Sequence, residues 1–311
     1  MSTEPSAIGN SGGSRLAPIA LFVYNRLDHA QQTVTALLAN DLASESDLIV
    51  FSDSAKTEQG MQAVSQVREF VHSIQGFKSI RIVERPTNWG LARSIISGVT
   101  EVCAHYGRVI VLEDDLVTSP RFLKYMNDGL DLYTEEERVI SIHGYMYPLE
   151  NQSESTFFLR GADCWGWATW QRGWNLFEPD GSKLLSLIRK SGLKNEFNFL
   201  GGEDYIRMLE SQIAGRNDSW AVRWYASAFL KDRLTLYPGR TLVLNIGNDG
   251  SGTHCGTSDY FSGEVSLRPI ELKKITLQED RAMRVAIGDY LRRGKRPLLR
   301  RILAKISSLG H

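Results

Sequence analysis

Short apolar runs alternate with helix-like segments over the first half of this 311-residue chain. The runs lie at 19–24, 48–51, 80–83, 108–112 and 139–142. Each is too short for a helix and is rich in the branched residues typical of buried strands. Apolar residues at helical spacing separate these runs, so the pattern predicts a mostly parallel α/β sheet with helices on both faces.

Local signals predict where two of the intervening helices begin. Asp28 is a candidate N-cap for a helix whose buried face carries Val34, Leu37 and Leu38. Pro120 suits the first position of the helix that follows the fourth run.

Three consecutive carboxylates, Glu113, Asp114 and Asp115, come directly after the fourth run. Ligands of open α/β sheets bind beyond the carboxyl ends of the strands. Crowded acids repel one another, and Mg²⁺ or Mn²⁺ can neutralise one or two carboxylates together with substrate phosphates. An isolated acidic triplet is more often a solvated turn, but this position favours a metal–phosphate site.

Right-handed crossovers would place the loops at Asn25, Asp53 and Asn88 on the same edge as the triplet. The chain has neither a GxGxxG motif nor a GxxxxGK[ST] phosphate loop. Their absence argues against a dinucleotide-dependent enzyme and a P-loop NTPase.

Cysteine usage and hydropathy indicate a cytoplasmic protein. Cys103, Cys164 and Cys255 lie far apart and form no CxxC pair, which favours a reducing compartment. The N-terminus shows no signal-peptide pattern, and no apolar run approaches the ~20 residues of a membrane span.

The C-terminal segment 281–311 carries nine basic residues against Asp289, a charge of +8, so residues 1–280 carry −8. A predicted helix over about 282–309 could lie on the anionic inner face of the cell membrane, or pack on its own domain or a partner. Nucleic acid is not an expected partner, since the body is not basic. One face of this helix carries Leu299, Ile302, Leu303, Ile306 and Leu309.

The second half of the chain is rich in aromatic residues. Trp165 and Trp167 could form a platform for a sugar ring, or simply pack in the core. Two acids, Glu203 and Asp204, follow a Gly-Gly turn, and Asp218 is either a helix cap or a functional acid. A Gly-rich loop that ends at His254 could approach a phosphate or a metal.

These features divide the chain into four parts. We expect a disordered leader at 1–14, a nucleotide-sugar-binding α/β half at 15–145 and an acceptor and catalytic half of the same domain at 146–260. A C-terminal extension with the basic amphipathic helix follows at 261–311.

The ordered set of motifs resembles glycosyltransferases of the GT-A fold, which is Rossmann-like. Residues 17–120 resemble family-two bacterial glycosyltransferases, and 17–258 more closely resemble the N-acetylglucosaminyltransferases that start complex N-glycan branching. The full chain also looks like bacterial transferases of surface-polysaccharide assembly. The motifs that carry the likeness are FVYNR, FSDS, RPTNWGLARSIISG, EDD, CWGW and the Gly-Thr-His loop.

The resemblance implies a role for individual residues. Asp115 corresponds to the metal-binding acid, and His254 to a histidine near the metal or diphosphate. Glu113 and Asp114 would lie near the metal and ribose, and Asp53 would read the nucleobase imide. Arg26 and Arg93 correspond to basic residues of the nucleotide pocket, and Trp165 and Trp167 are the expected acceptor contacts.

An inverting transferase also needs a base for the acceptor hydroxyl. The acid-bearing Trp-Asp-Asp-Trp segment of the N-acetylglucosaminyltransferases aligns with Trp220–Trp224, which contains no acid. The family-two ED motif points instead to Glu203 and Asp204. We therefore expect Asp204 as base, then Glu203, then Asp218; a retaining or inactive site follows if none lies near the metal.

The resulting hypothesis is a metal-dependent hexosyl- or N-acetylhexosaminyltransferase that uses Mn²⁺ or Mg²⁺. It would move a sugar from a nucleotide-diphosphate donor, UDP-linked in preference to GDP-linked, to a saccharide or lipid-linked saccharide in surface-polysaccharide assembly, with inversion. One alternative is an inactive carbohydrate- or nucleotide-binding protein of the same fold. The other is a sugar-nucleotide nucleotidyltransferase, against which the glycine-free loop Asn25–Asp28 argues.

Overall fold

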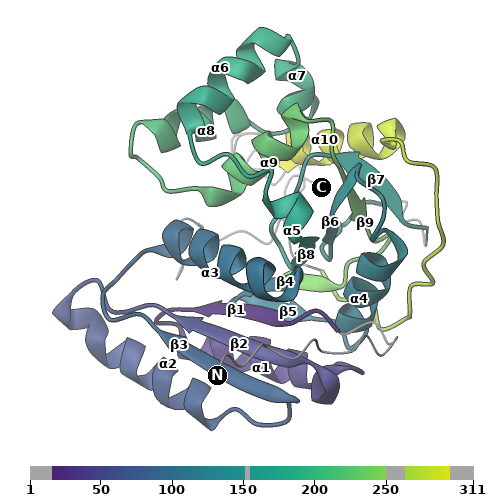
Figure 1. Cartoon of the computed structure of the whole chain (residues 1–311). Coiled ribbons are helices and arrows are strands. Elements are labelled where there is room, and N and C mark those ends of the chain that lie inside the picture. The colour runs from purple at the N-terminus through teal and green to yellow at the C-terminus, as the bar shows by residue number, and fades with distance from the viewer. Residues whose placement is uncertain (1–15, 151–154, 250–262, 295–311) are drawn as a thin grey trace, which may run out of the picture.

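The computed structural model describes residues 16–150, 155–249 and 263–294. Its centre is an eight-stranded sheet in the order β3-β2-β1-β4-β8-β6-β9-β7, and a two-stranded sheet, β10-β5, lies beside it (Figure 1). The strands are β1 (Ile19–Val23), β2 (Asp47–Ser52), β3 (Ser79–Glu84), β4 (Arg108–Glu113), β5 (Leu116–Thr118), β6 (Val139–His143), β7 (Phe157–Arg160), β8 (Trp167–Trp170), β9 (Leu234–Tyr237) and β10 (Val243–Asn245).

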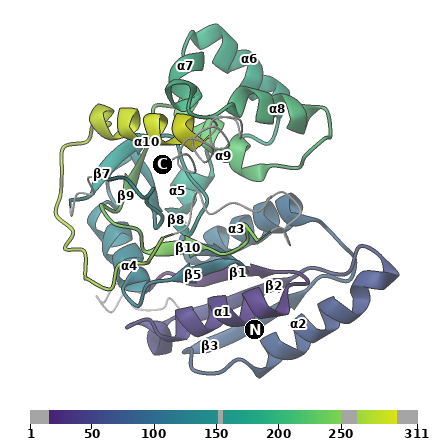
Figure 2. The ribbon, with the colours of Figure 1, turned by 180° about the vertical axis from the view of Figure 1, so that it is seen from behind.

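The helices cover the sheet and one end of it. The three helices of the first half are α1 (Leu27–Leu38), α2 (Met61–Ser73) and α3 (Leu91–Tyr106). The others are α4 (Phe122–Leu132), α5 (Gln171–Trp174), α6 (Gly181–Ser191), α7 (Lys194–Phe197), α8 (Tyr205–Ile213), α9 (Trp220–Leu230) and α10 (Arg281–Gly294). Figure 2 shows α1 and α2 together on one side of the sheet, and α6 to α9 as a separate helical lobe.

The large sheet is mostly parallel, as predicted. Strands β1 to β4 are parallel to one another, and β8 is antiparallel to both β4 and β6. Strand β9 is parallel to β6, and β7 is antiparallel to β9. Only β7 and β8 therefore run against the common direction among the eight strands.

Both faces of the sheet are buried, which explains the continuous apolar runs. Leu21 packs in the cluster that holds the apolar faces of α1 and α2, whereas its neighbour Phe22 packs with Ile95 and Val99 of α3. Successive strand residues point to opposite faces, so a doubly covered strand needs apolar residues at every position.

The five predicted strands are confirmed, but two helix starts and one buried position are wrong. Helix α1 begins at Leu27, so Asp28 lies in its first turn and does not cap it. Leu38 is 38% exposed. The unpredicted strand β5 follows the acidic triplet, and Pro120 precedes the first residue of α4 by two positions.

The described part of the basic C-terminal segment packs against its own domain. Arg284, Ile287 and Leu291 of α10 are buried. Residues 295–311, which include the predicted apolar face from Leu299 to Leu309, lie outside the described residues. Within the described ranges, no helix has the length and apolarity to cross a membrane.

Candidate functional site

The acidic triplet lies at the carboxyl end of β4, beside the loop that follows β1. Parallel pairing of β1 with β4 sets Phe22 opposite Glu113, and it brings Arg26 to the acids. The Arg26 guanidinium forms ion pairs with Asp114 and, at 2.7 Å, with Asp115 Oδ2. The structure thus brings Arg26 together with the triplet, and the roles predicted for these residues stay predictions.

Burial and mutual repulsion both act on the carboxylates of the triplet. Burial, followed by the charges of Asp115 and Asp114, raises the pKa of Glu113 to about 8, against a smaller opposing effect of Arg26. Burial also raises the pKa of Asp114, and Arg26 counteracts part of that rise. Burial lowers the pKa of Arg26, but Asp114 and Asp115 together raise it by more. The pKa of Arg26 therefore lies above its ordinary value. The site carries excess negative charge that one arginine does not neutralise.

Asp114 and Asp115 are held differently. The Asp114 carboxylate also accepts a hydrogen bond from the Tyr24 backbone N–H at 3.3 Å, and the Thr33 hydroxyl donates to its carbonyl at 2.8 Å. Asp115 uses Oδ2 for Arg26, and no hydrogen bond reaches its Oδ1 from the described parts of the chain. Asp114 is therefore fixed by the scaffold, and Asp115 keeps an oxygen for a ligand.

The segment that leads into the predicted Gly-rich loop runs along Asp115. The Ile246 N–H donates to the Asp115 carbonyl at 2.9 Å. A methyl group added at Gly247 would overlap the Asp115 carboxylate, so glycine permits this close approach. His29 Nε2 lies 3.3 Å from Asp249, which ties the segment to α1. His254 itself lies outside the described residues.

The donor set at the triplet fits a hard divalent cation. No cluster of three His, Cys, Asp or Glu side chains suited to a metal occurs within the described ranges. Mg²⁺ and similar ions need only one or two protein carboxylates when substrate phosphates and water complete the shell. Asp115, with one oxygen unengaged and like charges around it, meets that requirement.

Asp53 lies at the end of β2, where its carboxylate organises a neighbouring loop. It accepts hydrogen bonds from the backbone N–H groups of Trp89 and Gly90, each at 2.8 Å, and from the Asn88 amide at 3.1 Å. These contacts fix the chain just before α3. The predicted pairing of Asp53 with a nucleobase stays a prediction, and it would have to share oxygens that the loop already uses.

Arg93 projects from the first turn of α3 beside the loop that Asp53 fixes. Its guanidinium lies 4.0 Å from the ring centroid of Trp89, as does that of Arg85. Arg93 is exposed, and no described carboxylate forms an ion pair with it. A cation that stacks on an aromatic ring and lacks a counter-ion suits an anionic or planar ligand.

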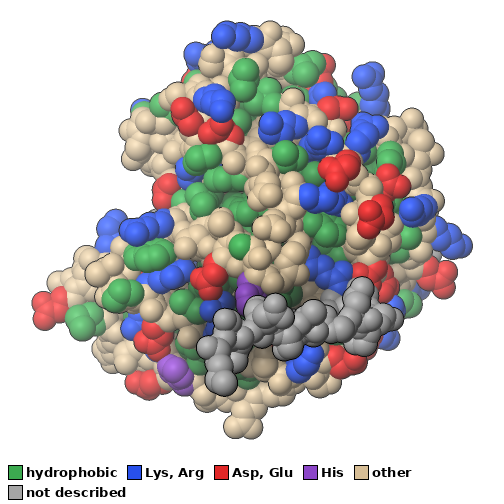
Figure 3. All heavy atoms as spheres, in the orientation of Figure 1, with side chains coloured by type: hydrophobic (Ala, Val, Ile, Leu, Met, Phe, Trp, Pro, Cys, Tyr) green, Lys and Arg blue, Asp and Glu red, His purple; other side chains and the backbone are tan. Residues whose placement is uncertain are grey.

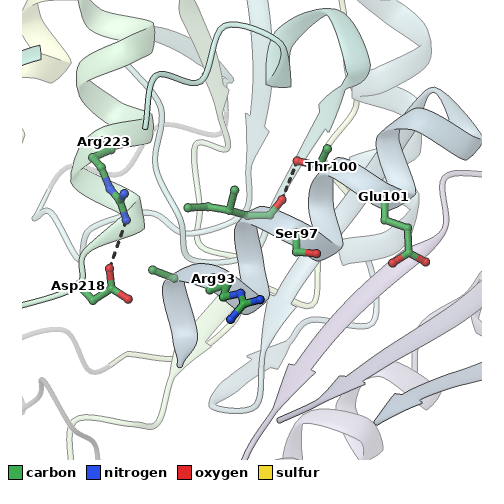
Figure 4. Close-up of a pocket in the computed structure, with 8 residues that line it drawn as sticks. Arg93, Ser97, Thr100, Glu101, Asp218 and Arg223 are labelled. Atoms are coloured by element: carbon green, nitrogen blue, oxygen red, sulfur yellow. Dashed lines mark hydrogen bonds and ion pairs between the residues drawn. The ribbon is translucent and has the colours of Figure 1, made fainter. Parts of the chain in front are cut away.

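A groove of about 560 Å³ separates α3 from the start of α9. In Figure 4, Asp218 and Arg223 lie on one side of it, and Arg93, Ser97 and Thr100 of α3 lie on the other. Arg223 is 7% exposed and donates to Asp218 Oδ1 at 3.4 Å and to the Ser219 carbonyl at 3.2 Å. Asp218 itself does not cap α9, because Ser219 fills that position. The groove brings together Asp218 and Arg93, which the sequence placed in different halves.

A second cavity, of about 310 Å³, lies on the other side of the start of α9. Glu203, Trp165 and Asp163 line it, and the roles of Glu203 as a base and of Trp165 as an acceptor contact stay predictions. Burial raises the pKa of the Cys164 thiol well above its usual range, and the charges of Asp163 and Glu113 raise it further. The pairing of β8 with β4 brings Cys164 towards the end of β4 that carries the triplet.

Asp204 lies apart from both cavities. Its side chain accepts a hydrogen bond from the Arg207 N–H at 3.2 Å and caps α8. The residue is exposed and lines neither the groove nor the second cavity. This local role explains why an acid follows the Gly-Gly turn, and it argues against the favoured assignment of Asp204 as base.

Trp167 is a core residue, so the prediction that it contacts an acceptor is wrong. Its side chain is fully buried in β8, with ring centroids 5.6 Å from Trp220 and 5.8 Å from both Trp174 and Trp224. Hydrophobic side chains gather in this region between α3 and the helical lobe (Figure 3). Only Trp165 of the predicted pair faces a cavity.

We expect Trp167→Ala to lower the free energy of unfolding by about 3–5 kcal/mol, because it removes a buried aromatic side chain from a packed cluster. Chemical denaturation monitored by circular dichroism measures the change. Trp165→Ala is the matched comparison, since Trp165 is only partly buried. An equal loss in both variants would contradict the assignment of Trp167 to the core.

Sequence reasoning did not identify Asp163 as a site residue. It lies just before β8, and the antiparallel pairing of β8 with β4 sets Trp167 opposite Val111. That pairing brings the segment before β8 to the end of β4 that carries the triplet. The aromatic motif two residues later was visible, but its placement depended on a strand that had not been predicted.

Comparison with known proteins reveals no family model that matches the chain, and no curated protein matches it. Solved structures give distant likenesses. The mannosyltransferase PcManGT from Pyrobaculum calidifontis, solved with GDP-Man and Mn²⁺, is 15% identical, with a TM-score of 0.29. That match covers 42% of this chain and 35% of PcManGT.

Two further structures are similar at the same distant level. S. aureus TarS is 14% identical over 56% of this chain and 29% of its own, with a TM-score of 0.34. A UDP-glucose pyrophosphorylase solved with UDP-glucose is 10% identical over 72% of this chain and 90% of its own, with a TM-score of 0.36. The chain therefore spans about a third of the first two proteins. The mostly parallel α/β sheet is consistent with a Rossmann-like GT-A fold.

Proposed function

We propose that this protein is a metal-dependent glycosyltransferase that moves a sugar from a nucleotide-diphosphate donor to a saccharide or lipid-linked saccharide. The observation that carries the proposal is the position of Asp115. It stands beside Arg26 at the carboxyl end of β4, and the pairing of β8 with β4 brings Asp163 and Cys164 of the aromatic cavity to that same end.

The residues divide into a donor side and an acceptor side. Asp115 would hold Mn²⁺ or Mg²⁺, which neutralises charge that grows on the departing diphosphate. Arg26 and Arg93 supply further positive charge, and the loop fixed by Asp53 supports the nucleoside. Trp165 and Glu203 belong to the acceptor side.

We propose Asp218 as the base of an inverting reaction, in preference to Glu203 and Asp204. Asp218 lines the groove, and its neighbour Ser219 lines the second cavity, so the start of α9 forms the boundary between the two. An acid at this boundary can reach a hydroxyl that approaches the donor from the acceptor side. The buried Arg223 holds it there.

A panel of nucleotide sugars tested with and without Mn²⁺ by thermal shift examines the function directly. We expect one donor to stabilise the protein only when the metal is present, by about 2.7 kcal/mol at a concentration of 100 Kd. Release of nucleoside diphosphate in the same mixture would separate an enzyme from an inactive binding protein. The proposal fails if no nucleotide sugar binds in either condition.

A further inference from the structure

The cavity of about 310 Å³ has the size and walls of a site for one sugar ring. Its aromatic wall includes Tyr147, Trp165, Tyr205, Tyr225 and Tyr237. Small-molecule sites are mostly apolar, with a few placed polar groups, and begin at roughly 300 Å³. Aromatic faces pack against the C–H faces of a pyranose, so the wall suits a single ring.

The charge of the cavity has one sign. Asp163 and Glu203 are its two acidic residues, and no Lys, Arg or His occurs among the described residues that line it. Sugar hydroxyls donate readily to carboxylates, and such charge-assisted hydrogen bonds are stronger than neutral ones. An acidic sugar would add a negative charge beside Asp163 and Glu203.

Two hydrogen bonds hold the Asp163 carboxylate in place. The Cys164 N–H donates to its Oδ1 at 2.8 Å, and the Tyr237 hydroxyl donates to its Oδ2 at 3.3 Å. The carboxylate still exposes 27% of its side chain. It is therefore fixed in orientation and yet open to a ligand.

A buried histidine lies behind Asp163 without cancelling its charge. His143 is fully buried, and its Nε2 lies 3.7 Å from Asp163 Oδ2. Neither ring nitrogen has a hydrogen-bond partner in the described part of the chain. Burial lowers the pKa of His143, and the charge of Asp163 only partly offsets this. A neutral imidazole leaves the cavity negative.

The loop that carries Glu203 is held in a strained conformation. Phe199 and Leu200 are in the left-handed region, with φ values of 49° and 57°. Such residues persist only where their surroundings enforce the conformation. Helix α10 does so here: Arg292 donates to the Leu200 carbonyl, and a methyl group on Gly288 would overlap the Phe199 carbonyl. These contacts fix the position of this edge of the cavity.

From this geometry we infer that the cavity binds an uncharged or amino-bearing pyranose ring of the acceptor and rejects acidic sugars. The assignment of this ring to the acceptor rests on the proposed function, but the class of sugar that the cavity binds does not. Binding of a simple glycoside requires neither donor nor metal, so the two proposals can fail separately.

The test compares methyl glucopyranoside with methyl glucuronopyranoside, which differ only at carbon 6. Binding to the full chain is measured by ligand-observed NMR and by quenching of tryptophan fluorescence. We expect the neutral glycoside to bind at least about tenfold more tightly, because like charges oppose the acidic one. Equal or tighter binding of the glucuronide would overturn the inference, as would no binding of either glycoside.

Two variants connect this preference to the cavity. Asp163→Asn and Glu203→Gln each remove one negative charge. Each is therefore expected to reduce the ratio of the affinities for the neutral and the acidic glycoside severalfold. Asp128→Asn is the charge-matched control, because Asp128 pairs with Lys124 on the exposed side of α4. Glu203→Gln serves alone if Asp163→Asn does not fold. If the ratio of affinities were the same in Glu203→Gln as in the Asp128→Asn control, the assignment of this cavity as the sugar site would be contradicted.

Discussion

Asp115→Asn is expected to reduce metal-dependent donor turnover by about 10³-fold or more, equivalent to the several kcal/mol that a bound metal contributes to charge stabilisation. Asparagine keeps the size of the side chain but lacks the charge that attracts a divalent cation. The same change should abolish the stabilisation that Mn²⁺ and donor produce together. Turnover and thermal shift, measured over a range of Mn²⁺ concentrations, check both effects.

The stability of the Asp115→Asn variant without metal provides a second, independent readout. Three carboxylates share this site with one arginine, and Arg26 would still pair with Asp114 after the substitution. Removing the charge that lies beside Asp114 and Glu113 relieves repulsion, so we expect unfolding to occur at an unchanged or slightly higher temperature. An active-site acid that destabilises the fold is a stronger sign of function than loss of activity alone.

Asp114→Asn is the informative comparison. Asp114 is buried, pairs with Arg26 and accepts from the Tyr24 N–H. Its replacement should destabilise the fold, because it weakens a buried ion pair. If Asp115→Asn behaved in the same way and kept full Mn²⁺-dependent turnover, the metal assignment would be wrong.

The parallel half of the fold could be read from the chain because each of its strands is buried on both faces. Val109 to Leu112, for example, form an uninterrupted apolar run that no surface strand would need. Strand order and chain direction then fixed which loops share an edge. The loops that carry Arg26 and the triplet, 87 or more residues apart in sequence, therefore belong to one edge of the sheet.

The antiparallel half could not be read in the same way. Strand β8 is only four residues long, Trp167 to Trp170, and its tryptophans looked like a ligand platform. Whether a tryptophan packs inward or faces a cavity depends on neighbours from α9 that lie more than 50 residues later. Asp163 was missed for the same reason, since only the pairing of β8 with β4 brings it to the site.

The roles of the acids depended on contacts that periodicity does not reveal. Asp204 and Asp53 both occur where a functional acid would be expected, yet each accepts hydrogen bonds from nearby backbone N–H groups. Asp218 looked like a helix cap, but Ser219 has that role. Short polar residues serve as caps and as catalysts, and only the location of their oxygens separates the two uses.

Asp218→Asn is expected to lower kcat by about 10²–10⁴-fold, the usual contribution of a positioned general base, while donor affinity stays within about twofold. Asparagine preserves the shape of the side chain and can still accept from Arg223, so the groove should keep its structure. Initial rates at saturating donor and acceptor, with donor affinity from thermal shift, separate the two quantities. A large rise in KM with unchanged kcat would instead assign Asp218 to substrate binding.

Three companion variants decide between the candidate bases. Glu203→Gln should weaken acceptor binding more than it slows the chemical step, because Glu203 lines the aromatic cavity. Asp204→Asn should leave kcat near the parent value, since asparagine also caps a helix. Asp128→Asn controls for the loss of one surface charge. If Glu203→Gln or Asp204→Asn caused the large fall in kcat and Asp218→Asn did not, the boundary position at the start of α9 would not be where the proton is taken.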